Sequence, residues 1–231
     1  MINTMITTRN TVIVTLGLMA VLMVGSAYAD DKGQPKILGK TYGEWSGKWW
    51  QWLDKQDPDP LTEQGFIDCS KGQQGAVWFL AGTDGYMGPI ERECTVPEGK
   101  PLFFPLVSLE FHNGPGETFS EDDKRDFLDG ILSDNIPGPF NTRACNLVAT
   151  VDSIPILFTG AAIIRTQSPP FKLYDDPKAV SDGFWVRLDL SEGHHTLHIK
   201  GALCSLDGQN VPWLPEVDVL YNLTVIGNES D

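Results

Sequence analysis

Glu110 and His112 are the pair of side chains in this sequence whose types and spacing are most compatible with a catalytic or metal-binding role. On an extended segment, residues two apart lie on one face, about 6.6 Å from each other. A carboxylate beside an imidazole suits acid–base catalysis or metal binding. The pair leads into a glycine-rich turn at 112–117, so it also has the form of an ordinary strand that ends in solvent. Both interpretations stay open.

Three aspartates could supply oxygen ligands to calcium, which takes about six to eight of them. All three lie in residues 168–183, a stretch with three prolines and no periodicity, which predicts a long irregular binding loop. The D-x-D-x-D-G ladder of a specific calcium loop is absent, and Asp57 and Asp59 form a second candidate pair. No other cofactor is expected. The candidate calcium ligands in the loop are Asp175, Asp176 and Asp182.

The histidines of the run His194-His195-x-x-His198 do not have the spacing of a metal site. The segment has the pattern of a strand, so His194 and His195 point to opposite faces. His194 and His198 share a face but lie about 13 Å apart, too far for one ion. The sequence also lacks a G-x-S-x-G elbow, a phosphate-binding glycine loop and an H-E-x-x-H motif.

Seven tryptophans are many for a chain of 231 residues. An exposed aromatic ring can stack on the apolar face of a sugar, and Trp50, Trp185 and Trp213 are the candidate ligand-binding rings. Trp213 is the candidate whose ring we most expect to be open, because it lies in a loop between Pro212 and Pro215, whereas most tryptophans are buried in the core. The tryptophans that share one face of the first predicted helix are assigned to the core, and these are Trp45, Trp49 and Trp52.

Two functions from different classes follow from these residues. The leading hypothesis is an exported, non-enzymatic binding or structural protein, with carbohydrate as the best candidate ligand. The alternative is a secreted hydrolase that uses Glu110 and His112 with an acid from residues 168–183. The binding protein requires an exposed aromatic strip on a sheet or its rim. The enzyme requires Glu110 and His112 to face a concave pocket with a third acid nearby.

Two helices are expected in the first half of the chain. Thr41 and Glu44 have the T-x-x-E spacing of a capping box, which predicts a helix from residue 41 to about residue 55. The run Asp57-Pro58-Asp59-Pro60 ends it. A second helix begins at Ser120, where Asp123 stands three residues on.

Strands account for most of the remaining pattern. Apolar runs predict strands at 75–82 and 101–111, with Pro105 marking an edge or a bulge, while residues 83–100 have no regular pattern. Several short strands separated by turn signals follow residue 141. Their spacing predicts a mainly β, α+β domain built on an antiparallel sandwich, with the two N-terminal helices packed against it.

Four cysteines are present, at positions 69, 94, 145 and 204. An even count in an exported chain indicates two disulfides. Three pairings are possible, and we favour Cys69–Cys94 with Cys145–Cys204, because each pair falls within one half of the chain. A zinc site is the rival interpretation, but no C-x-x-C spacing occurs.

Residues 1–29 have the pattern of a secretory signal peptide. Arg9 precedes an apolar stretch that is too short for a transmembrane helix, and Ala27-Tyr28-Ala29 is a small-x-small cleavage site. The mature chain is thus expected to be one domain over 30–231, with a helical half (41–140) and a β half (141–231). No membrane span is expected in it, and its location would be periplasmic or secreted.

The chain is strongly acidic, with a net charge of −14. Because residues 1–29 hold one Arg and no acid, removing them leaves −15. Such a surface repels nucleic acid and anionic lipid, which excludes both as expected partners.

Two short resemblances accompany this pattern. The run D-L-S-E-G-H-H-T-L-H-I at 189–199 resembles a hairpin common in immunoglobulin-like sandwiches of exported bacterial proteins, which implies an immunoglobulin-like fold. The run W-x-x-x-W-W-x-W, followed by VWFLAG and GKPLFFPL, resembles a family of uncharacterised exported bacterial proteins. It spans about residues 45 to 106 and implies no activity.

Overall fold

The computed structural model describes residues 35–85, 88–133, 142–206 and 216–227. These residues are mainly β-strand, with two helices, as the sequence predicts. The elements in the first half are β1 (Lys36–Ile37), β2 (Lys40–Thr41), α1 (Tyr42–Leu53), β3 (Gly65–Phe66), β4 (Trp78–Phe79), β5 (Ile90–Pro97), β6 (Leu102–Phe111) and α2 (Glu121–Leu132). Those in the second half are β7 (Thr142–Val151), β8 (Ile154–Pro155), a 3₁₀ turn (Ile156–Phe158), β9 (Ile163–Gln167), β10 (Phe171–Leu173), β11 (Asp176–Leu188), β12 (Gly193–Ser205) and β13 (Val217–Ile226).

Both helices begin where their capping residues predict. The Thr41 hydroxyl accepts a hydrogen bond from the Glu44 amide at 3.1 Å, and the Glu44 carboxylate accepts one from the Thr41 amide at 2.8 Å. Ser120 and Asp123 form the same reciprocal pair at the start of α2. Each capping box satisfies backbone N–H groups that the first helical turn leaves without partners. Among the described residues, neither helix is long and apolar enough to cross a membrane.

The strands form two large sheets and a small β1–β2 hairpin. One sheet has the order β10-β11-β6-β4, with β9 also beside β11, and the other has the order β3-β5-β13-β12-β7-β8. The expectation of purely antiparallel pairing is wrong in three places, because β5 runs parallel to both β13 and β3, and β4 runs parallel to β6. The reason is topological: β5 and β6 follow each other in sequence but join different sheets, so β5 pairs with the last strand of the chain.

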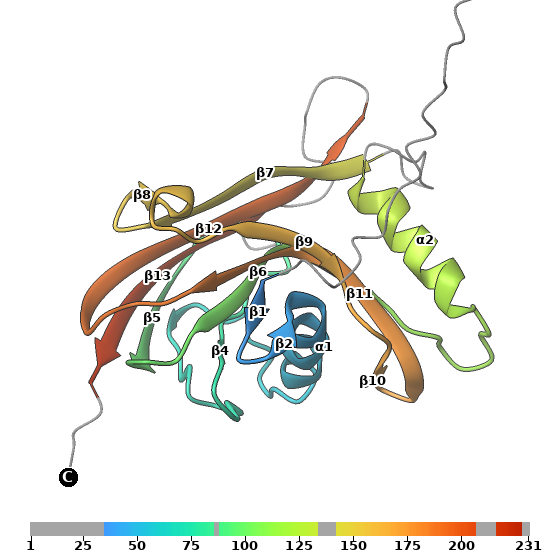
Figure 1. Ribbon diagram of the computed structural model, residues 1–231, viewed down its shortest axis with the longest axis horizontal. Helices are drawn as coiled ribbons and strands as arrows, with labels where there is room; N and C mark the ends of the chain where they lie inside the picture. The colour runs from blue at the N-terminus through green and yellow to red at the C-terminus, as the bar shows by residue number, and fades with distance from the viewer. Residues whose placement is uncertain (1–34, 86–87, 134–141, 207–215, 228–231) are drawn as a thin grey trace, which may run out of the picture.

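The two sheets face each other across the main core, which takes side chains such as Phe104 and Val186 from one sheet and Leu197 and Tyr221 from the other. On its other side, the five-stranded sheet packs against α1 through tryptophan and phenylalanine rings. In Figure 1, α2 lies beside β11 at one end of β7, and it contacts β6, β7 and β11. The outer face of the six-stranded sheet therefore stands on the side opposite α1.

Two segments that lack a regular pattern in the sequence are strands in the structure. Residues 83–100 contain β5, whose inward positions include Arg92 and Cys94, so the apolar alternation is hidden. Residues 168–183 form β10 and the first part of β11, with a turn at Tyr174 and Asp175. The expected irregular loop is thus wrong, because its aspartates find cationic partners on neighbouring elements and can be part of a strand.

Candidate functional site

The outer face of the six-stranded sheet carries a hollow of about 360 Å³. This volume is at the lower end of the range of about 300–1,000 Å³ that small-molecule sites occupy. One apolar ring and several polar groups line it. The side chains that matter for its chemistry are Phe66, Glu93, Thr95, His194, Asn222 and Thr224.

Strand pairing aligns the lining side chains in rows across the sheet. Phe66 is opposite Glu93, Glu93 is opposite Asn222, and Asn222 is opposite Thr196. These positions alternate with buried ones, so their side chains point away from the core. A second row lies beside the first and consists of Thr95, Thr224 and His194.

The hollow combines an open aromatic ring with hydrogen-bonding groups. The Phe66 side chain is 74% exposed. The Asn222 amide donates to the Glu91 carboxylate at 2.6 Å, and the Thr224 hydroxyl lies 3.2 Å from Nδ1 of His194. These contacts orient the amide and the hydroxyl before a ligand arrives. The arrangement suits a ligand with one apolar face and many hydroxyl groups.

Asp152 also lines the hollow, and the pKa of its carboxyl group is shifted from the ordinary aspartate value. Burial raises its pKa, but hydrogen bonds outweigh that effect and hold the pKa below the ordinary aspartate value. The His195 ring lies 2.8 Å from one carboxylate oxygen, and the Thr196 amide donates to the other at 2.8 Å. These contacts favour the ionised form of Asp152 in the folded protein.

Replacing Asp152 with Asn is expected to remove an acid-dependent part of the stability. A depressed folded-state pKa stabilises the protein above the unfolded-state pKa, about 3.9, and this contribution is lost as pH falls through the folded-state value. The difference in thermal midpoint between the parent and Asp152→Asn should therefore be largest near pH 5 and shrink below about pH 4. Asp175→Asn, in an exposed turn, is the control. A difference for Asp152→Asn that stays constant with pH would contradict this account.

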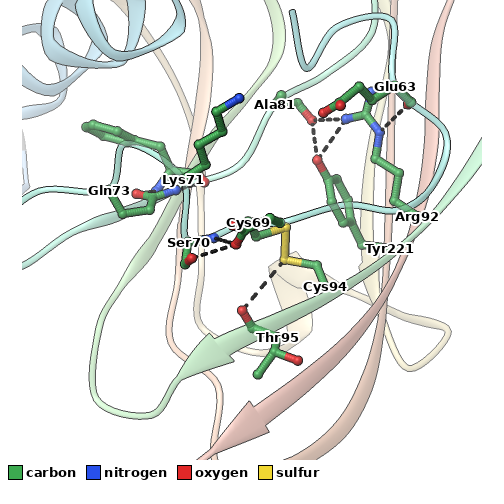
Figure 2. The surroundings of a disulfide bond; sticks show 12 residues. Glu63, Cys69, Ser70, Lys71, Gln73, Ala81, Arg92, Cys94, Thr95 and Tyr221 are labelled. Carbon is green, nitrogen blue, oxygen red and sulfur yellow. Dashed lines mark hydrogen bonds between the residues drawn. A yellow bond between two sulfur atoms is a disulfide. The ribbon is translucent and has the colours of Figure 1, made fainter. Parts of the chain in front are cut away.

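The chain is anchored on both sides of β3, the short strand that contains Phe66. Before β3, the Arg92 guanidinium donates to the Pro60 carbonyl at 2.6 Å and to the Glu63 carbonyl at 3.0 Å. Figure 2 shows Arg92 beside Glu63. The Cys69–Cys94 disulfide fixes the chain just after β3. The exposed ring is therefore presented by an anchored segment, which lowers the entropy cost of binding.

Arg92 is the most unusual buried residue of the protein. Its side chain is fully buried, and it donates to the carbonyls of Ala81 and Gly82 and to the Tyr221 hydroxyl as well as to the loop before β3. Burial also raises the pKa of Tyr221, despite the adjacent guanidinium. The sequence does not identify Arg92 as buried, because an arginine between glutamates in a charged stretch has the pattern of a solvated surface.

Glu110 and His112 do come together. Nδ1 of His112 lies 3.1 and 3.0 Å from the two carboxylate oxygens of Glu110, and both side chains are partly exposed. The Tyr174 ring packs against His112 with centroids 4.7 Å apart. Burial, together with the charges of Asp54 and Glu110, raises the pKa of Tyr174. Both contacts with Glu110 use Nδ1 of His112, and no hydrogen bond to its Nε2 occurs among the described residues.

The acids of residues 168–183 do not complete this pair or form a calcium site. Asp176 is buried in an ion pair with Lys124, and Asp182 is fully buried at 2.8 Å from Arg165, while Asp175 is exposed. Burial raises the pKa of Asp182, whereas hydrogen bonds outweigh burial and lower that of Asp176. The described residues contain no group of three or more potential metal ligands. The predicted calcium site is wrong, because Asp176 and Asp182 stand about 20 Å apart along one strand and each already has a cation.

The tryptophan candidates do not form an exposed strip. Trp185 is fully buried and stacks on Phe103 with centroids 5.0 Å apart, because α1 covers this face of β11. Trp50 is half-buried, and its indole donates to the Ser108 hydroxyl at 3.1 Å. Trp213 lies outside the described residues. The prediction that Trp185 binds ligand is therefore wrong, whereas Phe66 is an exposed ring on a sheet face.

Part of the hollow could have been found from the sequence. Clean alternation in 217–226 and in 193–199 identifies outward positions such as Asn222, Thr224 and His194. Phe66 has no such signal, because β3 has only two residues and stands between loops.

No family model matches the chain, and no curated protein matches it. A function has therefore to be inferred from the hollow and the residues that line it.

Proposed function

We propose that the protein is an exported, non-enzymatic binding protein whose ligand is a carbohydrate held on the outer face of the six-stranded sheet. The observation that carries this proposal is the exposed Phe66 ring at one end of the row formed with Glu93, Asn222 and Thr196. A sugar ring has an apolar C–H face that packs on an aromatic ring, and its hydroxyl groups both donate and accept hydrogen bonds. The carboxylate, amide and hydroxyl of this row supply both roles.

Export rests on two observations. The signal-peptide pattern of residues 1–29 directs the chain out of the cytoplasm, and these residues lie outside the described part of the structure. The two disulfides, Cys69–Cys94 and Cys145–Cys204, are those that the sequence predicts, and they fit an oxidising compartment. We place the mature protein in the periplasm or outside the cell.

The immunoglobulin-like character of the β half stays a prediction. The expectation that residues 189–199 belong to a hairpin is wrong, because β11 ends at Leu188 in the five-stranded sheet and the chain crosses to the six-stranded sheet, where β12 pairs with β7 and β13. The parallel neighbours of β5 are a departure from a purely antiparallel sandwich. Binding through an open sheet face does not depend on which sandwich topology applies.

Replacing Phe66 with Ala is expected to weaken glycan binding about tenfold, because the apolar face of the sugar loses its stacking partner. The measurement is a titration of the mature protein with neutral oligosaccharides, first found by a glycan screen. Phe158→Ala is the matched control, since Phe158 is 82% exposed at a different place.

Three outcomes of that experiment decide between the candidate functions. Weakening by Phe66→Ala alone supports the proposed site. Equal weakening by both variants, or no glycan binding, contradicts it. Release of new reducing ends from a bound glycan would instead favour a hydrolase, a second function that the hydrogen-bonded Glu110–His112 pair supports.

A further inference from the structure

A cluster of three phenylalanine rings brings together the end of β6, the residue before the Ser120 cap and the middle of α2. The Phe111 ring packs against Phe119 and Phe127, with centroids 5.3 and 5.0 Å apart. Phe119 is 48% exposed and Phe127 is 37% exposed. Exposed aromatic clusters of this kind are typical of protein interfaces, in which aromatic residues supply much of the binding energy.

The exposed rings are held by a rigid scaffold. The side-chain amide of Asn113 both donates to the Phe119 carbonyl at 3.1 Å and accepts from the Phe119 amide at 3.0 Å. The Asn113 backbone donates to Asp176 at 2.7 Å, and Asp176 is in turn paired with the buried Lys124 of α2. The exposure of Phe119 is therefore built into the fold and is not a consequence of a loose loop. A preorganised ring loses little entropy on binding.

Exposed acidic side chains accompany Phe127 on α2. Asp122, Asp123 and Asp126 lie on the exposed face of α2 together with Phe127. The two basic residues of α2 are engaged within the described part of the chain, because Lys124 pairs with Asp176 and Arg125 pairs with Glu121 at 2.7 Å. We call the three phenylalanines and these three aspartates the aromatic–acidic patch.

The negative charge of the aromatic–acidic patch disfavours anionic partners and favours a basic one. A second copy of this chain carries the same strongly negative charge, and an anionic membrane is negative as well, so both are repelled. A partner with apolar side chains on one helical face and Lys or Arg around them meets the rings and the aspartates together. We propose that the aromatic–acidic patch binds a basic amphipathic helical segment of another polypeptide.

The proposal is tested with the mature protein and a synthetic helical peptide of about 14 residues that carries Leu on one face and Lys elsewhere. Binding is measured by fluorescence anisotropy at about 50 mM and 500 mM salt. Saturable binding is expected at low salt. The Phe119→Ala/Phe127→Ala variant should weaken it at least about tenfold, because two aromatic contacts are lost. Thermal melting shows whether each variant is folded. If the double variant is unfolded, the single variant Phe119→Ala is used for the binding measurement in its place.

The controls distinguish binding at the aromatic–acidic patch from non-specific hydrophobic binding and from non-specific electrostatic attraction. Leu157→Ala/Phe158→Ala removes two side chains that are 66% and 82% exposed elsewhere, and should leave binding within about twofold. A peptide with Ser in place of Leu and a peptide with Glu in place of Lys should both bind at least about tenfold more weakly. The proposal is overturned if the Ser peptide binds as well as the Leu peptide, if both double variants weaken binding equally, or if no saturable binding occurs.

Discussion

Replacing Arg92 with Met is expected to lower the free energy of unfolding by about 3–5 kcal/mol. The fully buried guanidinium donates to four backbone carbonyls and to the Tyr221 hydroxyl. Methionine fills a similar volume but donates no hydrogen bond, so the carbonyls of Pro60, Glu63 and Gly82 would lose this donor. The Ala81 carbonyl keeps a second donor, the Tyr221 hydroxyl at 2.8 Å. Urea denaturation of the oxidised protein measures the change.

Two further variants show whether the loss comes from the buried contacts. Tyr221→Phe removes one partner of Arg92 and should cost only about 1–2 kcal/mol. Glu93→Gln, at the adjacent outward position of the same strand, should change stability by less than about 0.5 kcal/mol. If Arg92→Met proved as mild as Glu93→Gln, the guanidinium would not be needed to hold the loop.

Removing the Cys145–Cys204 disulfide by replacing both residues with Ala is expected to lower the free energy of unfolding by about 4 kcal/mol. The bond closes the longer loop, with a sequence separation of 59 residues against 25 for Cys69–Cys94, so it limits the unfolded chain more. Loop-closure entropy gives about 4.3 and 3.5 kcal/mol for the two bonds. Equilibrium unfolding in urea, with the remaining disulfide oxidised, measures each value.

The two disulfides should differ in their effect on binding as well as on stability. Cys69–Cys94 holds the segment that presents Phe66, so its replacement by two alanines should weaken glycan binding along with stability. Cys145–Cys204 joins β7 to β12, away from Phe66, so its removal should leave binding by the folded protein nearly unchanged. The opposite ranking, or equal effects on binding, would contradict the assigned role of the Phe66 segment.

The sequence by itself determined the features that depend on neighbouring residues. The capping pairs at Thr41 and Ser120 place both helix starts, because a cap is satisfied within three residues of chain. The long apolar strand at 102–111 follows from composition, and Pro105 lies next to the bulge between β6 and β11. The sequence left three disulfide pairings possible, and the structure confirms the favoured one, in which each pair lies within one half of the chain.

Only the tertiary structure decided which polar residues are buried and which aromatic rings are exposed. Arg92, Asp176 and Asp182 look like surface charges in the sequence, yet each is buried against partners from distant elements. Trp185 looks available for ligand and is covered by α1, whereas Phe66 is exposed beside polar groups of two other strands. The physical reason is that burial and pairing depend on contacts between segments far apart in the chain, and local sequence patterns carry no information about which segments meet.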